Sequence, residues 1–201
     1  MTRARDLHRN YEYSYLSSMS ERYKVIDSSV PTFITSTLIG WIDLFTKPQY
    51  TAILDDALNY AIEHKGLRIH AYVYMTSHIH LIATSSDVPL NDIMRDFKKF
   101  TAKRIVEAIK EGPESRREWL LDLMQAAANR IQRNQQYKVW QDGFHPVILD
   151  TQKKLEQRFQ YIHNNPLQLQ LVDDPGHWVH SSYRGYQDGG WRSNVELVLL
   201  W

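Results

Sequence analysis

The stretch HAYVYMTSHIHLIATSS, which runs from His70 to Ser86, decides the predicted fold. It is rich in β-branched and aromatic residues and is interrupted only at Thr76–Ser77. We therefore predict two strands, at 67–75 and 78–84, that pair as a hairpin. Within the second strand Ile79, Leu81 and Ala83 alternate with more polar positions, so one face of this strand can pack on helices.

The other face of the same strand carries two histidines, His78 and His80, one residue apart. Alternate side chains of a strand point to the same side, so the two imidazoles are predicted to lie next to each other. Neutral imidazole is a common ligand of divalent metals, so this spacing suggests a metal site. The alternative is a pair of partly exposed strand histidines without a special role.

The segments around this hairpin alternate between strand and helix patterns. We expect a strand at 31–45, helices at 50–65, 89–112 and 114–130, an extended segment at 137–149 and a helix at 151–164. Gly66 is predicted to end the first helix, Asp150 to cap the last helix and Pro166 to stop it. This order of elements favours an α+β sandwich with an antiparallel sheet.

Composition narrows the classes of protein. The chain has 201 residues, 43% of them hydrophobic and 23% charged, which is typical of one soluble globular domain. We expect residues 1–30 to form a polar tail and residues 31–201 to form the domain. No cysteine is present, which excludes disulfides and thiolate zinc sites, and no apolar run is long enough for a membrane helix. We therefore expect a cytoplasmic protein, and the net charge of +1 means that any surface for a polyanion must be local.

The helix predicted at 151–164 places one tyrosine away from its apolar side. The buried stripe is expected to consist of Leu155, Phe159 and Ile162. At about 100° per residue, Tyr161 falls instead with Lys154, Arg158 and Asn165 on a polar face. A phenol and an amide oxygen on one turn, facing two strand histidines, form a coherent set of a nucleophile and metal ligands. The alternative is a tyrosine at the solvent edge of the helix.

These motifs resemble those of a known family. The HIH of residues 78–80 and the YIHNNP of residues 161–166 are similar to motifs of the HUH single-tyrosine transposases, in particular the REP-associated tyrosine transposases. Further pieces are similar too: FITSTLIGWIDLF, AYVYMTSHIHLI, MRDFKKFTAKRI, ESRREWLL, VWQDGFHPVIL and HSSYRGY. The resemblance spans about residues 20–190.

The resemblance implies a ferredoxin-like (RRM-like) fold with the histidine strand in the centre of the sheet and helices flanking it. It implies that His78, His80 and Asn165 hold Mg²⁺ or Mn²⁺. It also implies that Tyr161 attacks a phosphodiester of single-stranded DNA and forms a covalent 5′-phosphotyrosine. The expected partners are DNA hairpins of repetitive palindromic elements, and the protein is expected to act as a monomer or a homodimer.

Substrate contacts are predicted along RDFKKFTAKR, residues 95–104. The basic residues of this run are Arg95, Lys98, Lys99, Lys103 and Arg104. Such a stripe suits a phosphate backbone, although an ordinary solvated helix face has the same pattern. Arg158 is a further predicted contact. Trp140, Phe144 and Tyr183 are candidates for stacking on unpaired bases, with core packing as the alternative for each.

Three functions are compatible with these patterns. The first is a metal-dependent enzyme that nicks single-stranded DNA and transfers strands. The second is a catalytically silent protein of the same fold that binds DNA hairpins or single strands. The third is a metal-stabilised module of unrelated role, which explains the two histidines but not the tyrosine that faces away from the core.

Overall fold

The computed structural model describes residues 25, 27–130, 135–187 and 195–200. Its centre is a four-stranded antiparallel sheet with the order β2-β3-β1-β4. The strands are β1 (Thr32–Thr37), β2 (Leu67–Tyr74), β3 (His78–Ser85) and β4 (Val147–Ile148). The strand order and the connections between β1 and β4 are those of a ferredoxin-like α+β fold, and the predicted central position of the histidine strand is confirmed.

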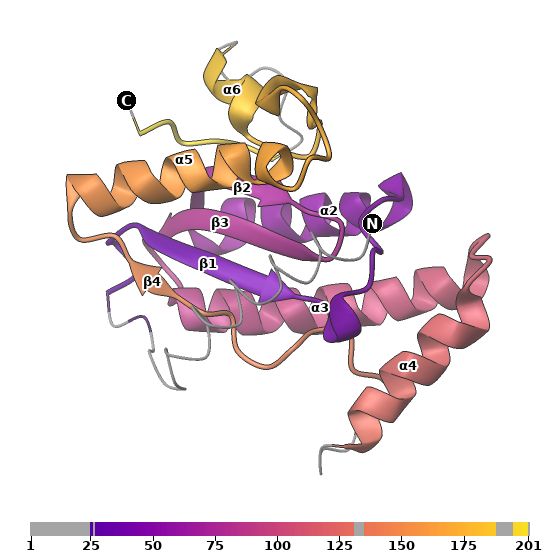
Figure 1. Ribbon diagram of the computed structural model, residues 1–201. Helices are drawn as coiled ribbons and strands as arrows, with labels where there is room; N and C mark the ends of the chain where they lie inside the picture. The colour runs from indigo at the N-terminus through magenta and orange to yellow at the C-terminus, as the bar shows by residue number, and fades with distance from the viewer. Residues whose placement is uncertain (1–24, 26, 131–134, 188–194, 201) are drawn as a thin grey trace.

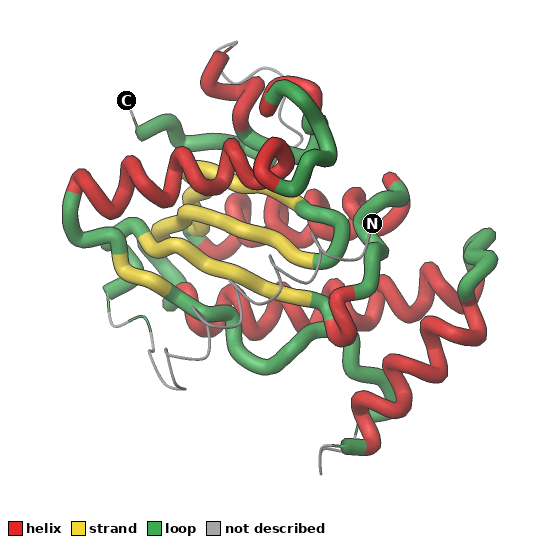
Figure 2. Tube along the Cα trace, in the orientation of Figure 1, coloured by secondary structure: helices red, strands yellow, loops and turns green. Residues whose placement is uncertain are grey.

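Helices cover both faces of the sheet (Figures 1 and 2). α2 (Pro48–Lys65) and α3 (Leu90–Glu111) pack on one face, and α5 (Gln152–Gln168) lies across the other. α4 (Arg117–Asn129) contacts α3, and α6 (Tyr183–Gln187) lies beyond α5. None of these described helices is both long enough and apolar enough to cross a membrane.

Alternation along β3 divides its side chains between two cores. Ile79, Leu81 and Ala83 join the larger apolar cluster under α2 and α3. Ile82 joins a smaller cluster under α5, together with Phe33, Phe159 and Ile162. All eight residues of β3 are buried, because the strand is central and helices lie on both of its faces.

Several predicted boundaries hold, and their local causes are visible. Gly66 ends α2 in the left-handed region at φ 68°, and its N–H donates to the Ala61 carbonyl. The extended segment predicted at 137–149 is present, since Trp140 bridges Leu38 and β4 pairs with β1.

Three predicted boundaries are wrong: the end of the first strand, the cap of α5 and the end of α5. The strand expected at 31–45 ends at Thr37, because the chain turns into a 3-10 helix, η1 (Ile39–Trp41). Thr151, not Asp150, caps α5, since its side chain accepts the Lys154 N–H, while the Asp150 carboxylate pairs with the Lys154 ammonium at 2.7 Å.

Pro166 does not stop α5, which continues to Gln168. A proline removes its own N–H and crowds the carbonyl four residues before it, but the helix can go on beyond it, and the Leu169 N–H still donates to the Asn165 carbonyl at 3.2 Å. Pro166 itself is buried, so packing holds the last turn in helical form.

The ends of the described part of the chain are held against β3, α3 and β2. The Ser85 N–H donates to the Ser28 carbonyl, and Val25 exchanges two hydrogen bonds with the Asn91 amide. The folded unit therefore includes residues before 31, whereas residues 1–24 of the predicted tail lie outside the described residues. Near the other end, Leu197 forms a bridge beside Ile69 on β2, which sequence patterns did not predict.

Candidate active site

The two histidines of β3 lie side by side on the face that α5 covers. Their ring centroids are 4.8 Å apart, and the exposed fractions of His78 and His80 are 3% and 2%. The predicted open face is therefore partly closed by α5. The alternative of partly exposed histidines is wrong, because both side chains are buried.

Neighbouring hydroxyls orient both imidazole rings. Thr35 is the cross-strand partner of His80, and its hydroxyl lies 2.8 Å from His80 Nδ1. The Ser77 hydroxyl lies 3.3 Å from His78 Nδ1. Since Nδ1 is engaged in each ring, Nε2 is the nitrogen that a metal would use. Sequence patterns did not single out Thr35, because its position opposite His80 depends on the pairing of β1 with β3.

Tyr161 reaches this pair from α5. Phe159 and Ile162 are buried in the cluster under α5 and hold the helix on the sheet, as the predicted apolar stripe requires. Tyr161 is only partly buried, and its ring lies 5.2 Å from the His80 ring and 5.8 Å from the Phe33 ring. The predicted approach of this tyrosine to the histidines is therefore present, while the side chain stays partly exposed at the edge of α5.

Four rings form a row across this face. Trp41 contacts His78 at 5.6 Å, His78 contacts His80 at 4.8 Å, and His80 contacts Tyr161 at 5.2 Å, each with steeply inclined planes. The Arg158 guanidinium lies over the Phe33 ring at 4.8 Å and near the Tyr161 ring at 5.7 Å. One cation thus lies beside the phenol at one end of the row.

Asn165 is a buried amide one helical turn after Tyr161. It is 0% exposed, and neither Oδ1 nor Nδ2 has a hydrogen-bond partner among the described residues. Contacts of α5 show in which direction it runs along β2. Phe159 packs on Tyr186, and the Tyr186 hydroxyl donates to the carbonyl of His70. One turn later, His163 contacts Ser182, which is hydrogen-bonded to Tyr72, two residues further along β2. Asn165 follows in the same direction and therefore lies toward the end of β2 that pairs with the start of β3, where His78 and His80 are.

The donor types of His78, His80 and Asn165 are ones that bind divalent cations. A buried amide without hydrogen bonds costs free energy of folding, so a ligand that engages its oxygen would offset that cost. Two imidazoles and one amide oxygen are suitable ligands for Mn²⁺, and they leave positions for substrate oxygens. No group of three or more His, Cys, Asp or Glu side chains suited to a metal occurs in the described part of the chain. A third protein ligand is therefore better sought in an amide such as Asn165.

His163 belongs to the packing of α5. It is 3% exposed, its Nε2 lies 2.8 Å from the Ser182 hydroxyl, and its ring packs on Phe159 and Tyr186. Burial lowers the pKa of His163 from 6.5 to about 4, so the ring is neutral at physiological pH.

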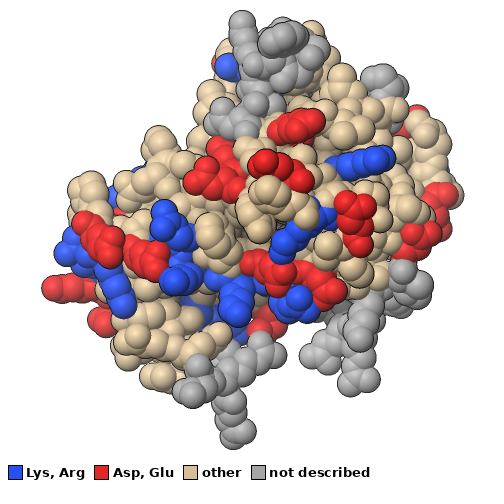
Figure 3. All heavy atoms as spheres, turned by 180° about the vertical axis from the view of Figure 1, so that it is seen from behind, with Lys and Arg blue, Asp and Glu red and all other residues tan. Residues whose placement is uncertain are grey.

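The predicted basic stripe lies on α3, on the opposite side of the sheet from α5, the helix that carries Tyr161 (Figure 1). Arg95 pairs with Asp92 and Asp96, and Lys103 and Arg104 both lie near Glu107. From behind, Lys and Arg are mixed with Asp and Glu (Figure 3). The stripe is therefore partly neutralised, and Lys99 is its exposed member without an ion pair among the described residues.

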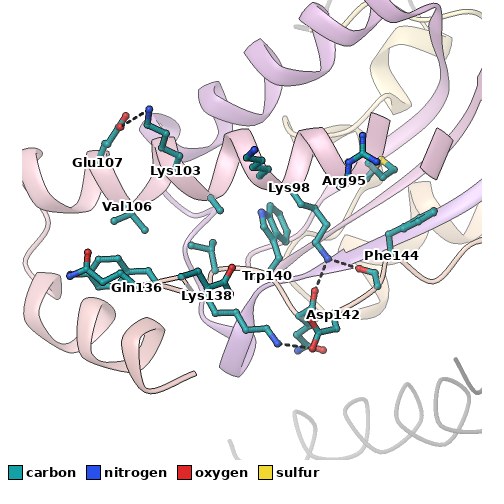
Figure 4. Close-up of a pocket in the computed structure, with 18 of the residues that line it drawn as sticks. Arg95, Lys98, Lys103, Val106, Glu107, Gln136, Lys138, Trp140, Asp142 and Phe144 are labelled. Atoms are coloured by element: carbon teal, nitrogen blue, oxygen red, sulfur yellow. Dashed lines mark hydrogen bonds and ion pairs between the residues drawn. The ribbon is translucent and has the colours of Figure 1, made fainter. Parts of the chain in front are cut away.

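A groove of about 800 Å³ separates α3 from residues 135–144 (Figure 4). Arg95, Lys99 and Lys103 line it, whereas the Lys98 ammonium donates to the backbone carbonyls of Gln141 and Gly143. Burial lowers the pKa of Lys98 to about 8. The assignment of Lys98 to an exposed DNA-binding stripe is therefore corrected: its ammonium ties α3 to the segment that leads to β4.

The prediction that Trp140 stacks on a DNA base is also wrong. It is 5% exposed, its indole N–H donates to the Thr101 hydroxyl at 3.0 Å, and its ring packs on Phe45 and Phe97. A ring held in this way has no open face on which a base could stack. Phe144 packs against the same core, and the Tyr183 ring contacts His163.

Comparisons with known proteins bear on the fold. No protein-family model matches the chain, and a search of curated proteins finds no match. Among solved structures, the chain is similar to a REP-associated tyrosine transposase bound to a REP hairpin, with 21% identity, a TM-score of 0.59, and coverage of 86% of this chain and 88% of that one.

A second solved structure, a protein of Deinococcus radiodurans R1 described as a transposase, matches with 15% identity and a TM-score of 0.40 over 73% of this chain and 94% of that one. The resemblance inferred from the motifs is thus confirmed for the fold by the first of these structures. The chain has the fold of a REP-associated tyrosine transposase.

Proposed function

We propose that this protein cuts and rejoins single-stranded DNA through a covalent 5′-phosphotyrosine at Tyr161. The observation that carries the proposal is the approach of the Tyr161 ring to His80, at 5.2 Å, within one row of rings that includes His78. The phenol packs beside Phe33 and is also partly exposed next to two buried imidazoles. It suits a nucleophile that reaches a phosphate bound at the histidines.

In this proposal His78, His80 and Asn165 hold Mg²⁺ or Mn²⁺. The bound cation would polarise the scissile phosphate and stabilise the charge that develops there. The Thr35 hydroxyl, 2.8 Å from His80 Nδ1, would keep that ring turned with Nε2 toward the cation. The role of Asn165 rests on its buried amide, which has no hydrogen-bond partner among the described residues.

Tyr161 then supplies the nucleophile. Its oxygen forms a bond to phosphorus, and the bond from phosphorus to the 3′ oxygen of the preceding nucleotide breaks. The phenolic proton passes to solvent, and the departing oxygen takes up a proton to become a 3′-hydroxyl. A free phenol has a pKa of ~10 and is a weak nucleophile at neutral pH, so the attack needs the charge stabilisation that the cation and Arg158 would supply at the phosphate. A second 3′-hydroxyl can reverse the step and rejoin strands without a further source of energy.

We propose hairpin-forming repetitive palindromic DNA as the substrate, because the similar solved structure is a transposase bound to a REP hairpin. Arg158 would contact phosphate at the cut site. Arg95, Lys99, Lys103 and Arg104 would contact backbone on the far side of the sheet, where three of these four line the groove beside α3.

Incubation with hairpin-bearing single-stranded DNA and Mn²⁺, followed by a denaturing gel, tests the proposal. We expect a covalent band with the wild type, none with Tyr161→Phe, and an unchanged band with Tyr60→Phe, a matched control whose side chain is 57% exposed on α2. Peptide mapping should place the nucleotide on Tyr161.

Two results would contradict the proposal. If the wild type binds hairpins but never forms the band, the silent DNA-binding protein is the better description. If Tyr161→Phe still forms it, another side chain is the nucleophile.

A further inference from the structure

The turn after β1 contains an unusual backbone conformation. Gly40 and Trp41 both have positive φ, at 61° and 54°. Glycine adopts this region freely, but for a bulky side chain it is an outlier that persists only where the surroundings enforce it. Such outliers cluster at functional sites, and this one lies directly beside His78.

The neighbours of Trp41 hold this conformation from two sides. The Leu38 N–H donates to the Ser77 carbonyl at 2.9 Å, which joins the turn to the residue that precedes His78. The Ile39 N–H donates to the Val139 carbonyl at 2.9 Å, and the side chains of Ile39 and Ile42 are buried. The indole is therefore held at a fixed place relative to the two histidines.

The indole has two features that packing does not require. Its ring meets the His78 ring edge to face, with centroids 5.6 Å apart and planes inclined by 73°. Its Nε1 is buried and has no hydrogen-bond partner among the described residues. A buried donor without a partner is costly, and a strained backbone adds to the cost, so a role in ligand binding would account for both.

We propose that the Trp41 N–H donates a hydrogen bond to a phosphate oxygen of the DNA strand that enters beside His78. This inference rests on the proposed function. A fixed donor shielded from water stabilises charge that develops on phosphate oxygens more strongly than an exposed donor does. The ring of Trp41, through its contact with His78, also keeps that imidazole in place.

Three variants separate the roles of the N–H and the ring. Trp41→Phe removes the donor and keeps an aromatic ring, Trp41→Ala removes both, and Trp119→Phe is a matched control because Trp119 is 51% exposed on α4. For Trp41→Phe we expect the single-turnover rate of adduct formation to fall by about 100-fold. Its Mn²⁺ affinity, measured by electron paramagnetic resonance, should match the wild type, and its unfolding midpoint should not fall, because the variant removes a buried donor that has no partner among the described residues. For Trp41→Ala we expect Mn²⁺ affinity to fall as well, by about 10-fold.

A direct readout is the indole N–H resonance of Trp41, assigned by its absence in Trp41→Phe. Addition of hairpin DNA should move it downfield, and the Trp119 resonance should stay in place. If the wild type forms the adduct, and Trp41→Phe forms it at the same rate with an unmoved resonance, the inference is wrong and the proposed function stands. If the wild type forms no adduct, the proposed function fails first.

Discussion

The two faces of the sheet use alternate residues of the same strands for different purposes. On the face under α2 and α3, Ile79, Leu81 and Ala83 meet a large apolar cluster. On the face under α5, Ile82 packs in a smaller cluster, while His78 and His80 of the same strand lie beside Tyr161. One strand therefore supplies both the core and the candidate site.

The α2/α3 face therefore contributes mainly to stability, whereas the α5 face also carries the candidate site. Natural proteins break the rules of good packing mainly where a ligand is bound. Asn165 on the α5 face breaks them, because its amide is buried without hydrogen bonds in the described residues. Four predictions would break or sharpen this comparison.

The largest expected effect is on the α2 face. Leu58→Ala removes a side chain that is 0% exposed and should lower the free energy of unfolding by about 2–5 kcal/mol, as urea denaturation would measure. The rate at which the remaining folded protein forms the adduct should not change.

Ile162→Ala removes a side chain that is also 0% exposed but lies on α5. It should lower the free energy of unfolding by a similar amount and also slow adduct formation, because it loosens the helix that carries Tyr161. Equal slowing by both variants would show that the faces are not separable.

The second effect is a dependence of the free energy of unfolding on pH, caused by His163 on α5. The pKa of His163 is 6.5 in the unfolded chain and about 4 in the folded protein, because burial disfavours the charged ring. Between these values the unfolded chain binds the proton and the folded protein does not. The free energy of unfolding should therefore fall by about 3 kcal/mol as the pH drops from 6.5 to 4. In His163→Gln this part of the slope should disappear, and an unchanged slope would assign it to other groups.

The third effect concerns the orientation of His80. Thr35→Val removes the hydroxyl that lies 2.8 Å from His80 Nδ1. We expect Mn²⁺ affinity to fall by about 10- to 100-fold, measured by titration. Thr32→Val on the same strand is the control, since its hydroxyl donates to the Val30 carbonyl instead. Equal losses in both variants would point to a general disturbance of β1.

The smallest expected effect is a gain in stability. Asn165→Leu replaces a buried amide by an apolar side chain of similar size, so the free energy of unfolding should rise by about 1 kcal/mol. Mn²⁺ affinity should fall in the same protein. A loss of stability without a change in Mn²⁺ affinity would mean that Asn165 serves the packing of α5.

Local patterns in the sequence determined the hairpin, the helices and the side of β3 on which His78 and His80 lie. These features depend on periods of two and 3.6 residues, which act over a few positions and are visible in the chain itself. The prediction of a polar face for Tyr161 and Asn165 is wrong: Tyr161 packs beside Phe33 at the edge of the cluster under α5, and Asn165 is buried.

Only the tertiary structure decided the features that depend on distant partners. Pairing of β1 with β3 places Thr35 against His80, and the contact of η1 with Ser77 and Val139 bends the chain at Trp41. Packing on Thr101 buries Trp140, carbonyls of residues 141 and 143 engage Lys98, and burial carries α5 past Pro166. Local propensity cannot determine these outcomes, because each depends on the free energy of contacts between residues that the fold brings together.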